Sequence, residues 1–326
     1  MLTEKILVTG AAGFIGRHLV RRLVSKKHSV VALVRTPEQA KSLKGFGCEI
    51  VQGDLLRKDT IIGLSQKITQ VFHLAAKADL KTKRGKALVV NTQGTSNLLQ
   101  AIRGFSLKRF VLMSSIVAAG RRRGSRLSLP LDTSCTEVPD NAYGRSKREA
   151  ERIVIDAFYG TDTEWVILRP ALVYGPGSRP FAGLSALVDL SKGPGILGRL
   201  NFPGRISVIY VSDLIDVCEL AAKGIIRGGR SIFVASYESV TFGQIMITAT
   251  DILGQSRKFI SLVGIATIVQ NVYDGLDAAI GISKWIPAYM LAPFGSSLAC
   301  DTHDLKKIGY RPRHSLRTGL TQMLRA

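Results

Sequence analysis

The sequence predicts an α/β fold in which a doubly wound parallel sheet is followed by a smaller C-terminal lobe. Three observations lead to this prediction. A short apolar run at 6–8 passes through spaced glycines into a helical pattern. Strand-like and helix-like patterns then alternate up to about residue 175. Beyond that point the chain becomes richer in glycine, proline and apolar residues, which indicates a second lobe.

The first strand ends in a glycine-rich turn that is typical of nucleotide-binding sites. Gly10 permits a tight turn, and Gly13 lets backbone N–H groups approach a pyrophosphate. Gly16 lets the helix expected at 17–23 lie close to the strand, with its N-terminus toward the phosphates. Three glycines alone also fit an ordinary turn. Their position between a strand and a helix favours the binding interpretation.

The second strand, expected at 30–34, ends at Arg35, and a helix is expected to begin near Glu38. An acidic residue here would bind the ribose 2′-hydroxyl of NAD, whereas a cation suits the extra phosphate of NADP. We therefore expect NADP as the preferred cofactor, with NAD as the alternative. An ordinary surface role for Arg35 stays open.

The next two strands, expected at 49–52 and 70–73, also lead to the carboxyl edge of the sheet, where parallel sheets bind ligands. Asp54 is placed there to accept a hydrogen bond from the adenine amino group. His73 continues an apolar strand, so we expect a core histidine. Asn91 interrupts the apolar stripe of a helix at 87–102, so its amide requires a buried partner.

A serine, a tyrosine and a lysine form the candidate catalytic set. The strand expected at 109–113 delivers Ser114 and Ser115, and a later helix carries Tyr143 and Lys147 one turn apart. A free phenol has a pKa of about 10 and is a poor acid or base at neutral pH. An ammonium group and an oxidised nicotinamide ring beside it would lower that pKa. A Ser115 hydroxyl donating to the substrate oxygen completes the set.

Several segments appear in the order typical of one known family: TGAAGFIG, NTQGTSNLL, a strand ending in SS, YGRSK and LRPALVYGPG. With them the chain, from residue 5 to at least 213, resembles the extended short-chain dehydrogenase/reductase family, also called the NAD-dependent epimerase/dehydratase family. The resemblance implies a Rossmann-type fold with Tyr143 as proton donor or acceptor, Lys147 as its ribose-binding partner and Ser115 as ligand of the substrate oxygen. Ser114 is the alternative for that last role. The residues that it places at the cofactor are Gly10, Gly13, Phe14, Ile15, Gly16, Arg35, Asp54, Leu55, Ala75, Ala76, Asn91, Tyr143, Lys147 and Pro170.

Within that family the segment MSSIVAAG, at 113–120, resembles the branch of 3β-hydroxysteroid dehydrogenases, sterol dehydrogenases and dihydroflavonol reductases. Nucleotide-sugar members usually have an asparagine soon after the YGP motif and an arginine seven residues before a later aspartate. Here no asparagine lies between Gly177 and Arg199, and Ile206 stands seven residues before Asp213. The resemblance thus implies an NAD(P)-dependent oxidoreductase that interconverts a secondary alcohol and a ketone on an apolar, steroid- or lipid-like substrate. Two alternatives stay open: a nucleotide-sugar epimerase or dehydratase, and a non-catalytic NADP-binding regulatory protein.

The domain organisation is expected to be discontinuous. Residues 1–175 would form the cofactor domain, with 206–236 returning to it, and 176–205 and 237–326 would form the substrate-binding lobe. Helices are expected at 181–190 and 262–276. Core packing is the first interpretation of the apolar stripe in the second helix, and a lipid-binding face is the alternative.

The net charge of +21 is high for an enzyme of small molecules. The sequence contains no recognisable nucleic-acid module, so the charge predicts a solvated basic surface first and contact with an anionic membrane or substrate second. The basic loop at 121–126 is interpreted as a solvated surface loop, with a cover over the substrate as the alternative.

The four cysteines are far apart, which predicts free thiols and no metal site. No run of 18 uncharged apolar residues appears, and the chain starts with its first strand. We therefore expect a cytoplasmic protein, with peripheral membrane contact open, and the family resemblance implies a homodimer.

Overall fold

A computed structural model of the chain describes residues 5–64, 67–78, 86–120, 130–132, 139, 141–178, 184–193, 195–255, 257–280, 293–294 and 298–325. The chain divides into two compact units. The first is made of Met1–Ala118, Ala142–Arg169 and Ile215–Ile232, and the second of Ala119–Asn141, Pro170–Leu214 and Phe233–Ala326. Several predicted features lie outside the described residues: the basic loop 121–126, Cys135 and the first three residues of the helix expected at 181–190.

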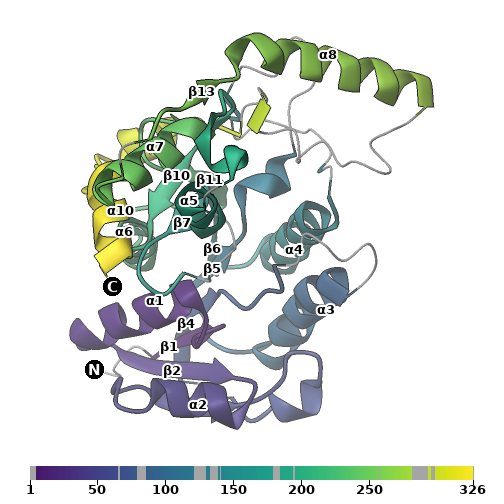
Figure 1. Cartoon of the computed structure of the whole chain (residues 1–326). Coiled ribbons are helices and arrows are strands. Elements are labelled where there is room, and N and C mark those ends of the chain that lie inside the picture. The colour runs from purple at the N-terminus through teal and green to yellow at the C-terminus, as the bar shows by residue number, and fades with distance from the viewer. Residues whose placement is uncertain are drawn as a thin grey trace. The chain divides into compact units, whose positions relative to one another are not determined.

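A seven-stranded sheet with the strand order β11-β6-β5-β4-β1-β2-β3 forms the centre of the first unit (Figure 1). Its strands are β1 Lys5–Thr9, β2 Ser29–Val34, β3 Glu49–Gln52, β4 Ile68–His73, β5 Arg109–Met113, β6 Glu164–Pro170 and β11 Arg230–Val234. From β3 to β6 all neighbouring strands run parallel. The chain order reverses between β1 and β4, which is where open parallel sheets bind their ligands. The predicted fold class is confirmed.

Helices flank this sheet. They are α1 Phe14–Ser25, α2 Pro37–Leu43, α3 Lys86–Ala101, α4 Ala142–Phe158 and α6 Val211–Ala222, with short 3₁₀ helices η1 Lys58–Thr60 and η2 Ile116–Ala119. α3 packs against α4. On α1, Arg22 binds Asp216 and Glu219 of α6, with N–O distances of 2.7 and 3.1 Å. Buried side chains from strands and helices, such as Leu7 and Leu98, form one core between the layers.

The first helix begins earlier than predicted. The sequence predicted 17–23, but α1 starts at Phe14 because Gly13, in an extended conformation, takes the N-cap position. Gly16 therefore lies in the first turn of the helix.

The second unit contains three two-stranded ribbons, β10 with β7, β12 with β9 and β13 with β8. Its elements are β7 Leu172–Tyr174, α5 Leu184–Lys192, η4 Ile196–Arg199, β8 Leu200–Asn201, β9 Arg205–Ile206, β10 Val208–Tyr210, β12 Val240–Thr241, α7 Phe242–Ile252, β13 Ile260–Ser261, α8 Val263–Ile280, α9 His303–Lys307 and α10 Leu316–Arg325. A capping box of Thr241 and Gln244 starts α7. Ile245, Met246 and Ala249 of this helix are fully buried in the core of the unit.

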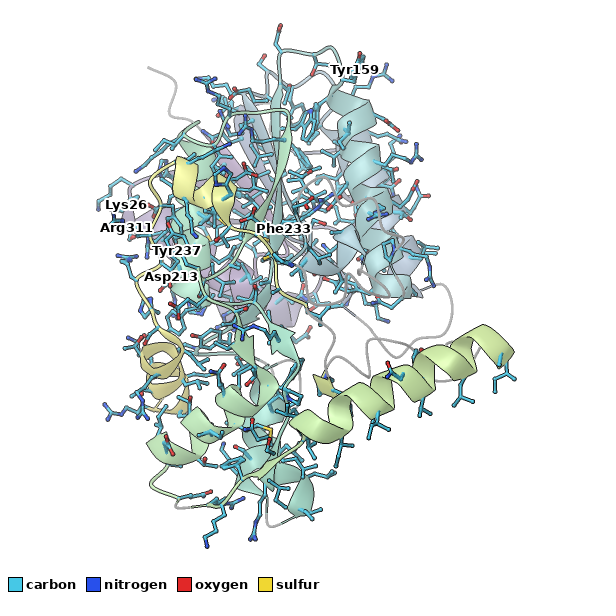
Figure 2. All side chains as sticks on the ribbon, turned by 90° about the horizontal axis from the view of Figure 1, so that it is seen from above. Lys26, Tyr159, Asp213, Phe233, Tyr237 and Arg311 are labelled. Atoms are coloured by element: carbon cyan, nitrogen blue, oxygen red, sulfur yellow. The ribbon has the colours of Figure 1, made fainter. Side chains whose placement is uncertain are left out.

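The prediction that α8 packs into the core is wrong for much of its apolar stripe. Leu262 and Tyr273 are buried, but Ile265, Val272 and Leu276 are exposed. Figure 2 shows α8 as one long helix with its side chains projecting from it. Among the described residues, no helix combines the length and the hydropathy that a transmembrane span requires.

Candidate active site

The glycine turn between β1 and α1 brings three backbone segments into close contact. Gly10 has a φ of +66°, and a Cβ atom there would lie 2.7 Å from the backbone N of Ala75. A Cβ atom on Gly16 would lie 2.1 Å from the carbonyl oxygen of Gly10. The N–H of Gly13 donates to that same oxygen at 2.9 Å. The geometry of this turn therefore excludes side chains at Gly10 and Gly16.

The N-terminus of α1 is suited to bind a phosphate group. Among the described residues, no side chain caps it, and its first turn, with Phe14 and Ile15, contains no acidic residue. The exposed Gly13 stands in front of it. Unpaired N–H groups and the positive end of the helix dipole together favour an anion at such a place. The turn thus fits the pyrophosphate of a dinucleotide.

A buried relay of hydrogen bonds connects the ends of β1 and β4. His73 Nδ1 lies 2.7 Å from Thr9 Oγ1, and its Nε2 lies 3.0 Å from Thr95 Oγ1. The Thr95 hydroxyl donates to the carbonyl oxygen of Asn91, so His73 Nε2 carries the ring proton and Nδ1 accepts from Thr9. Burial and the charge of Lys147 lower the pKa of His73 to about 3. His73 is therefore a neutral core histidine, as its apolar strand predicted.

The same relay positions the loop after β4. The N–H of Ala75 donates to Thr9 Oγ1 at 3.1 Å, which holds this loop beside the glycine turn. Asn91 Oδ1 accepts from the N–H of Lys77 at 2.8 Å. Ala76, between these two anchored residues, is exposed.

The residues predicted for the adenosine half of the cofactor lie at the ends of β2 and β3. Arg35 directly follows β2 and is exposed, and its N–H donates to Gln39 Oε1 at 2.8 Å. Asp54 Oδ1 accepts from the N–H of Leu56 at 2.9 Å. The carbonyl oxygen of Leu55 accepts from Asn97 of α3 at 2.6 Å. Pro170, which was also predicted to contact the cofactor, does not belong to this group. It is the last residue of β6.

The predicted catalytic residues meet at the carboxyl end of β5. The side chains of Tyr143 and Ser115 are hydrogen bonded to each other. Lys147 Nζ donates to the carbonyl oxygen of Met113 at 2.7 Å, and the lysine is almost completely buried. Ser115, which follows β5, is thus bonded to Tyr143 of α4, and Lys147 of the same helix reaches the last residue of β5.

Burial has the largest effect on the pKa values of Tyr143 and Lys147. Burial raises the pKa of Tyr143 to about 12, although its hydrogen bond with Ser115 acts in the opposite direction. Burial lowers the pKa of Lys147 to about 8, against the opposing effect of the Glu151 carboxylate. In the protein alone, therefore, desolvation and not the neighbouring ammonium determines the pKa of the phenol.

A buried ion pair between Arg169 and Glu151 lies next to the candidate catalytic residues, and the sequence analysis did not predict it. Ser114 donates to Oε1 of Glu151, and Arg169 binds both oxygens of that carboxylate at 2.9 and 2.6 Å. The Ser114 hydroxyl is thus committed to Glu151, whereas Ser115 bonds Tyr143. The sequence spacing could have indicated that Glu151 is near Lys147, because Glu151 follows Lys147 by four residues and therefore lies on the same face of the helix.

Asn91 has a supporting position in this site. Its Nδ2 donates to Ser146 Oγ at 2.8 Å, and Ser146 in turn donates to the carbonyl oxygen of Tyr143 at 2.7 Å. With its bond to Lys77, Asn91 connects the loop after β4 to the first turn of α4.

Comparison with known proteins identifies the family. Residues 6–232 match the model of the NAD dependent epimerase/dehydratase family. A UDP-glucose 4-epimerase from Vibrio cholerae is 33% identical over 223 residues, which cover 66% of each chain. A 3 beta-hydroxysteroid dehydrogenase/Delta 5→4-isomerase from Mycobacterium tuberculosis is 27% identical and covers 98% of this chain and 89% of its own. A 2-alkyl-3-oxoalkanoate reductase from Shewanella oneidensis is 28% identical over 84% of this chain and 70% of its own.

Solved structures share the fold. UDP-glucuronic acid 4-epimerase from Bacillus cereus, in complex with UDP-glucuronic acid and NAD, superposes with a TM-score of 0.73 at 23% identity, covering 98% of this chain and 97% of the other. UDP-glucose 4-epimerase from Thermus thermophilus, in complex with NAD, gives a TM-score of 0.74 at 20% identity with 98% of both chains covered. With a family model that covers more than half of its length, the chain belongs to the NAD dependent epimerase/dehydratase family and is an NAD(P)-dependent enzyme of the extended short-chain type.

Proposed function

We propose that the protein interconverts a secondary alcohol and a ketone on an apolar, steroid- or lipid-like substrate. The observation that carries this proposal is the hydrogen bond between Ser115 and Tyr143 at the carboxyl end of β5, with the buried Lys147 beside it. The similarity to a 3 beta-hydroxysteroid dehydrogenase over nearly the whole chain supports the substrate class.

In this mechanism each of the three residues has a separate role. Tyr143 exchanges a proton with the substrate oxygen through its phenol, and Ser115 donates a hydrogen bond to that oxygen. Lys147 binds ribose hydroxyls and stabilises the phenolate when the phenol has given up its proton. The glycine turn and the N-terminus of α1 hold the pyrophosphate. When bound, the nicotinamide supplies or takes up the hydride.

Replacing the phenol tests the mechanism. Tyr143→Phe removes the proton donor but keeps the ring, so turnover should fall by about 10²–10⁴-fold. NADPH oxidation would be followed over a panel of ketosteroids and long-chain ketones, and the NADPH dissociation constant should stay nearly unchanged. Turnover retained in this variant would refute the role of Tyr143.

The two serines provide a matched pair for the same assay. Ser115→Ala removes the group bonded to Tyr143 and should reduce turnover, whereas Ser114→Ala removes a group committed to Glu151. The smaller effect on turnover is expected for Ser114→Ala. A larger loss of turnover in Ser114→Ala than in Ser115→Ala would instead make Ser114 the ligand of the substrate oxygen.

The similarity to UDP-glucose 4-epimerase favours a second candidate, a nucleotide-sugar epimerase or dehydratase. Thermal stabilisation by UDP-glucose would support it, and we expect none. No NADPH oxidation over the whole panel would instead favour a non-catalytic NADP-binding regulator.

We also propose NADP over NAD as the cofactor, because the exposed Arg35 at the end of β2 is available for a 2′-phosphate. Arg35→Asp should weaken NADPH binding by at least about tenfold and strengthen NADH binding, as measured by fluorescence titration. Arg103→Asp, which changes another exposed cation after α3, is the control. An unchanged ratio of the two dissociation constants would contradict the preference.

A further inference from the structure

One face of α8 presents aliphatic side chains to solvent. Successive members are separated by three, four, four and four residues, a spacing that keeps them on one side of the helix. They are Ile265 (52% exposed), Ile268 (62%), Val272 (56%), Leu276 (40%) and Ile280 (67%). A continuous exposed stripe of this kind indicates an interaction surface.

The neighbouring elements extend this stripe. β13 pairs with β8 so that Ile260 lies opposite Leu200, and η4 directly precedes β8. Because the two strands run parallel, η4 lies beside the residues that precede β13, and β13 leads directly into α8. The exposed side chains added in this way are Ile196, Leu197, Ile260 and Val263. Of these four, Val263 is the first residue of α8 itself. We call these four residues and the five of the stripe the aliphatic surface.

The segments around the aliphatic surface are basic. Neither 190–212 nor 252–273 contains an aspartate or glutamate. They carry the exposed cations Arg199 and Lys258, and also Lys192, which pairs with Asp189 at 3.4 Å. The later part of α8 has Asp274 and Asp277, so attraction to an anion would come from the segments that precede the helix.

Charge and composition favour a lipid bilayer over a second copy of the chain. Two copies would each bring a net charge of +21, and like charges oppose association. The aliphatic surface also lacks the Trp, Tyr and Arg anchors that dominate protein interfaces. An aliphatic face close to lysine and arginine is instead typical of segments that lie in the interface of an anionic membrane. Here α8 itself contains no lysine or arginine, and the cations come from Arg199 and Lys258 in the segments that precede it.

We propose that the aliphatic surface inserts into the interface of an anionic phospholipid bilayer, with α8 lying in the plane of the membrane. The 18 residues of α8 span about 27 Å at 1.5 Å per residue, which is long enough to present five aliphatic side chains at one depth. This inference does not depend on the reaction catalysed.

Vesicle co-sedimentation tests the proposal. The full-length protein should bind vesicles of phosphatidylcholine with roughly one-third phosphatidylglycerol, and bind pure phosphatidylcholine at least about tenfold more weakly. The triple variant Ile268→Ser/Val272→Ser/Leu276→Ser should lose at least about tenfold in partition coefficient on the mixed vesicles. Its matched control, Ile62→Ser/Val89→Ser/Ile225→Ser, changes exposed aliphatic residues of the first unit and should bind like the wild type.

A charge-reversal pair tests the electrostatic part. Arg199→Glu/Lys258→Glu should weaken binding to the mixed vesicles, whereas Lys26→Glu/Arg311→Glu, at two exposed cations labelled in Figure 2, should have a smaller effect. Equal effects of the two pairs would show that binding depends on the net charge of the protein and not on cations near the aliphatic surface, which would overturn the proposal.

Two further measurements separate the remaining outcomes. NADPH affinity of the triple variant should match the wild type, which shows that it is folded whether or not the proposed reaction is correct. Light scattering measures the oligomeric state. A dimer that the triple variant disrupts, together with no vesicle binding by the wild type, would show that a second copy covers the surface and would overturn the proposal.

Discussion

Glu151 is a buried residue that interacts with Ser114, Arg169 and the candidate catalytic residue Lys147. Its carboxylate is nearly completely buried, accepts from Ser114 and binds Arg169 through both oxygens. It also acts on Lys147, whose pKa it raises against the effect of burial. We regard it as a positioning residue, because it affects the site through the residues it touches.

Glu151→Gln tests this role. The amide keeps the shape but removes the charge that raises the pKa of Lys147, so that pKa should fall below its value of about 8. Below the pKa the lysine is an ammonium and above it a neutral amine. The alkaline decline of turnover should therefore begin at lower pH in the variant, which a profile of kcat against pH would measure.

Two further variants separate this electrostatic effect from simple destabilisation. Glu151→Gln leaves Arg169 buried without its carboxylate, which costs about 3–5 kcal/mol in the free energy of unfolding. Adding Arg169→Met removes that cation and should recover much of the stability. Glu149→Gln, on the exposed side of α4, should change neither property appreciably. A folded Glu151→Gln single variant with the wild-type pH profile would disprove the role of Glu151.

At the scale of single elements, the contact between α1 and β1 decides whether a cofactor fits. The sequence predicted a turn that contains Gly10, Gly13 and Gly16, with the helix beginning at residue 17. The structure instead uses Gly13 as the N-cap and Gly16 as part of the helix, where the absence of a side chain permits backbone contact. The spacing of the glycines predicted a nucleotide-binding turn. It did not predict which glycines belong to the turn and which to the helix, because that depends on the backbone contact between Gly16 and Gly10 in the folded chain.

Gly16→Ala measures this contact. Its Cβ atom would lie 2.1 Å from the carbonyl oxygen of Gly10, so α1 must shift away from the turn. We expect a loss of about 1–3 kcal/mol in the free energy of unfolding and at least about tenfold weaker NADPH binding. The control is Gly63→Ala, where the added Cβ would meet no atom of the described residues within 4 Å. Equal effects of both substitutions would show that the close approach is unimportant.

At the scale of the whole molecule, periodicity predicted the sheet well. The strands expected at 49–52 and 109–113 have those bounds in the structure, since their apolar runs are short and clearly bounded. The apolar stripe of α8 was also recognised, but spacing defines a face without saying what covers it. Likewise, the pKa of Tyr143 depends on burial, which spacing along one helix does not reveal.

The last strand of the seven-stranded sheet has a consequence for synthesis on the ribosome. β11, at Arg230–Val234, occupies the edge next to β6, which ends at Pro170, so some sixty residues separate the two strands in the chain. A nascent polypeptide that has emerged only as far as residue 170 therefore displays β6 with an open side, and open strands invite pairing with other chains. Completion of the sheet has to wait for translation to pass residue 234, which makes this interval the period in which chaperone protection matters most.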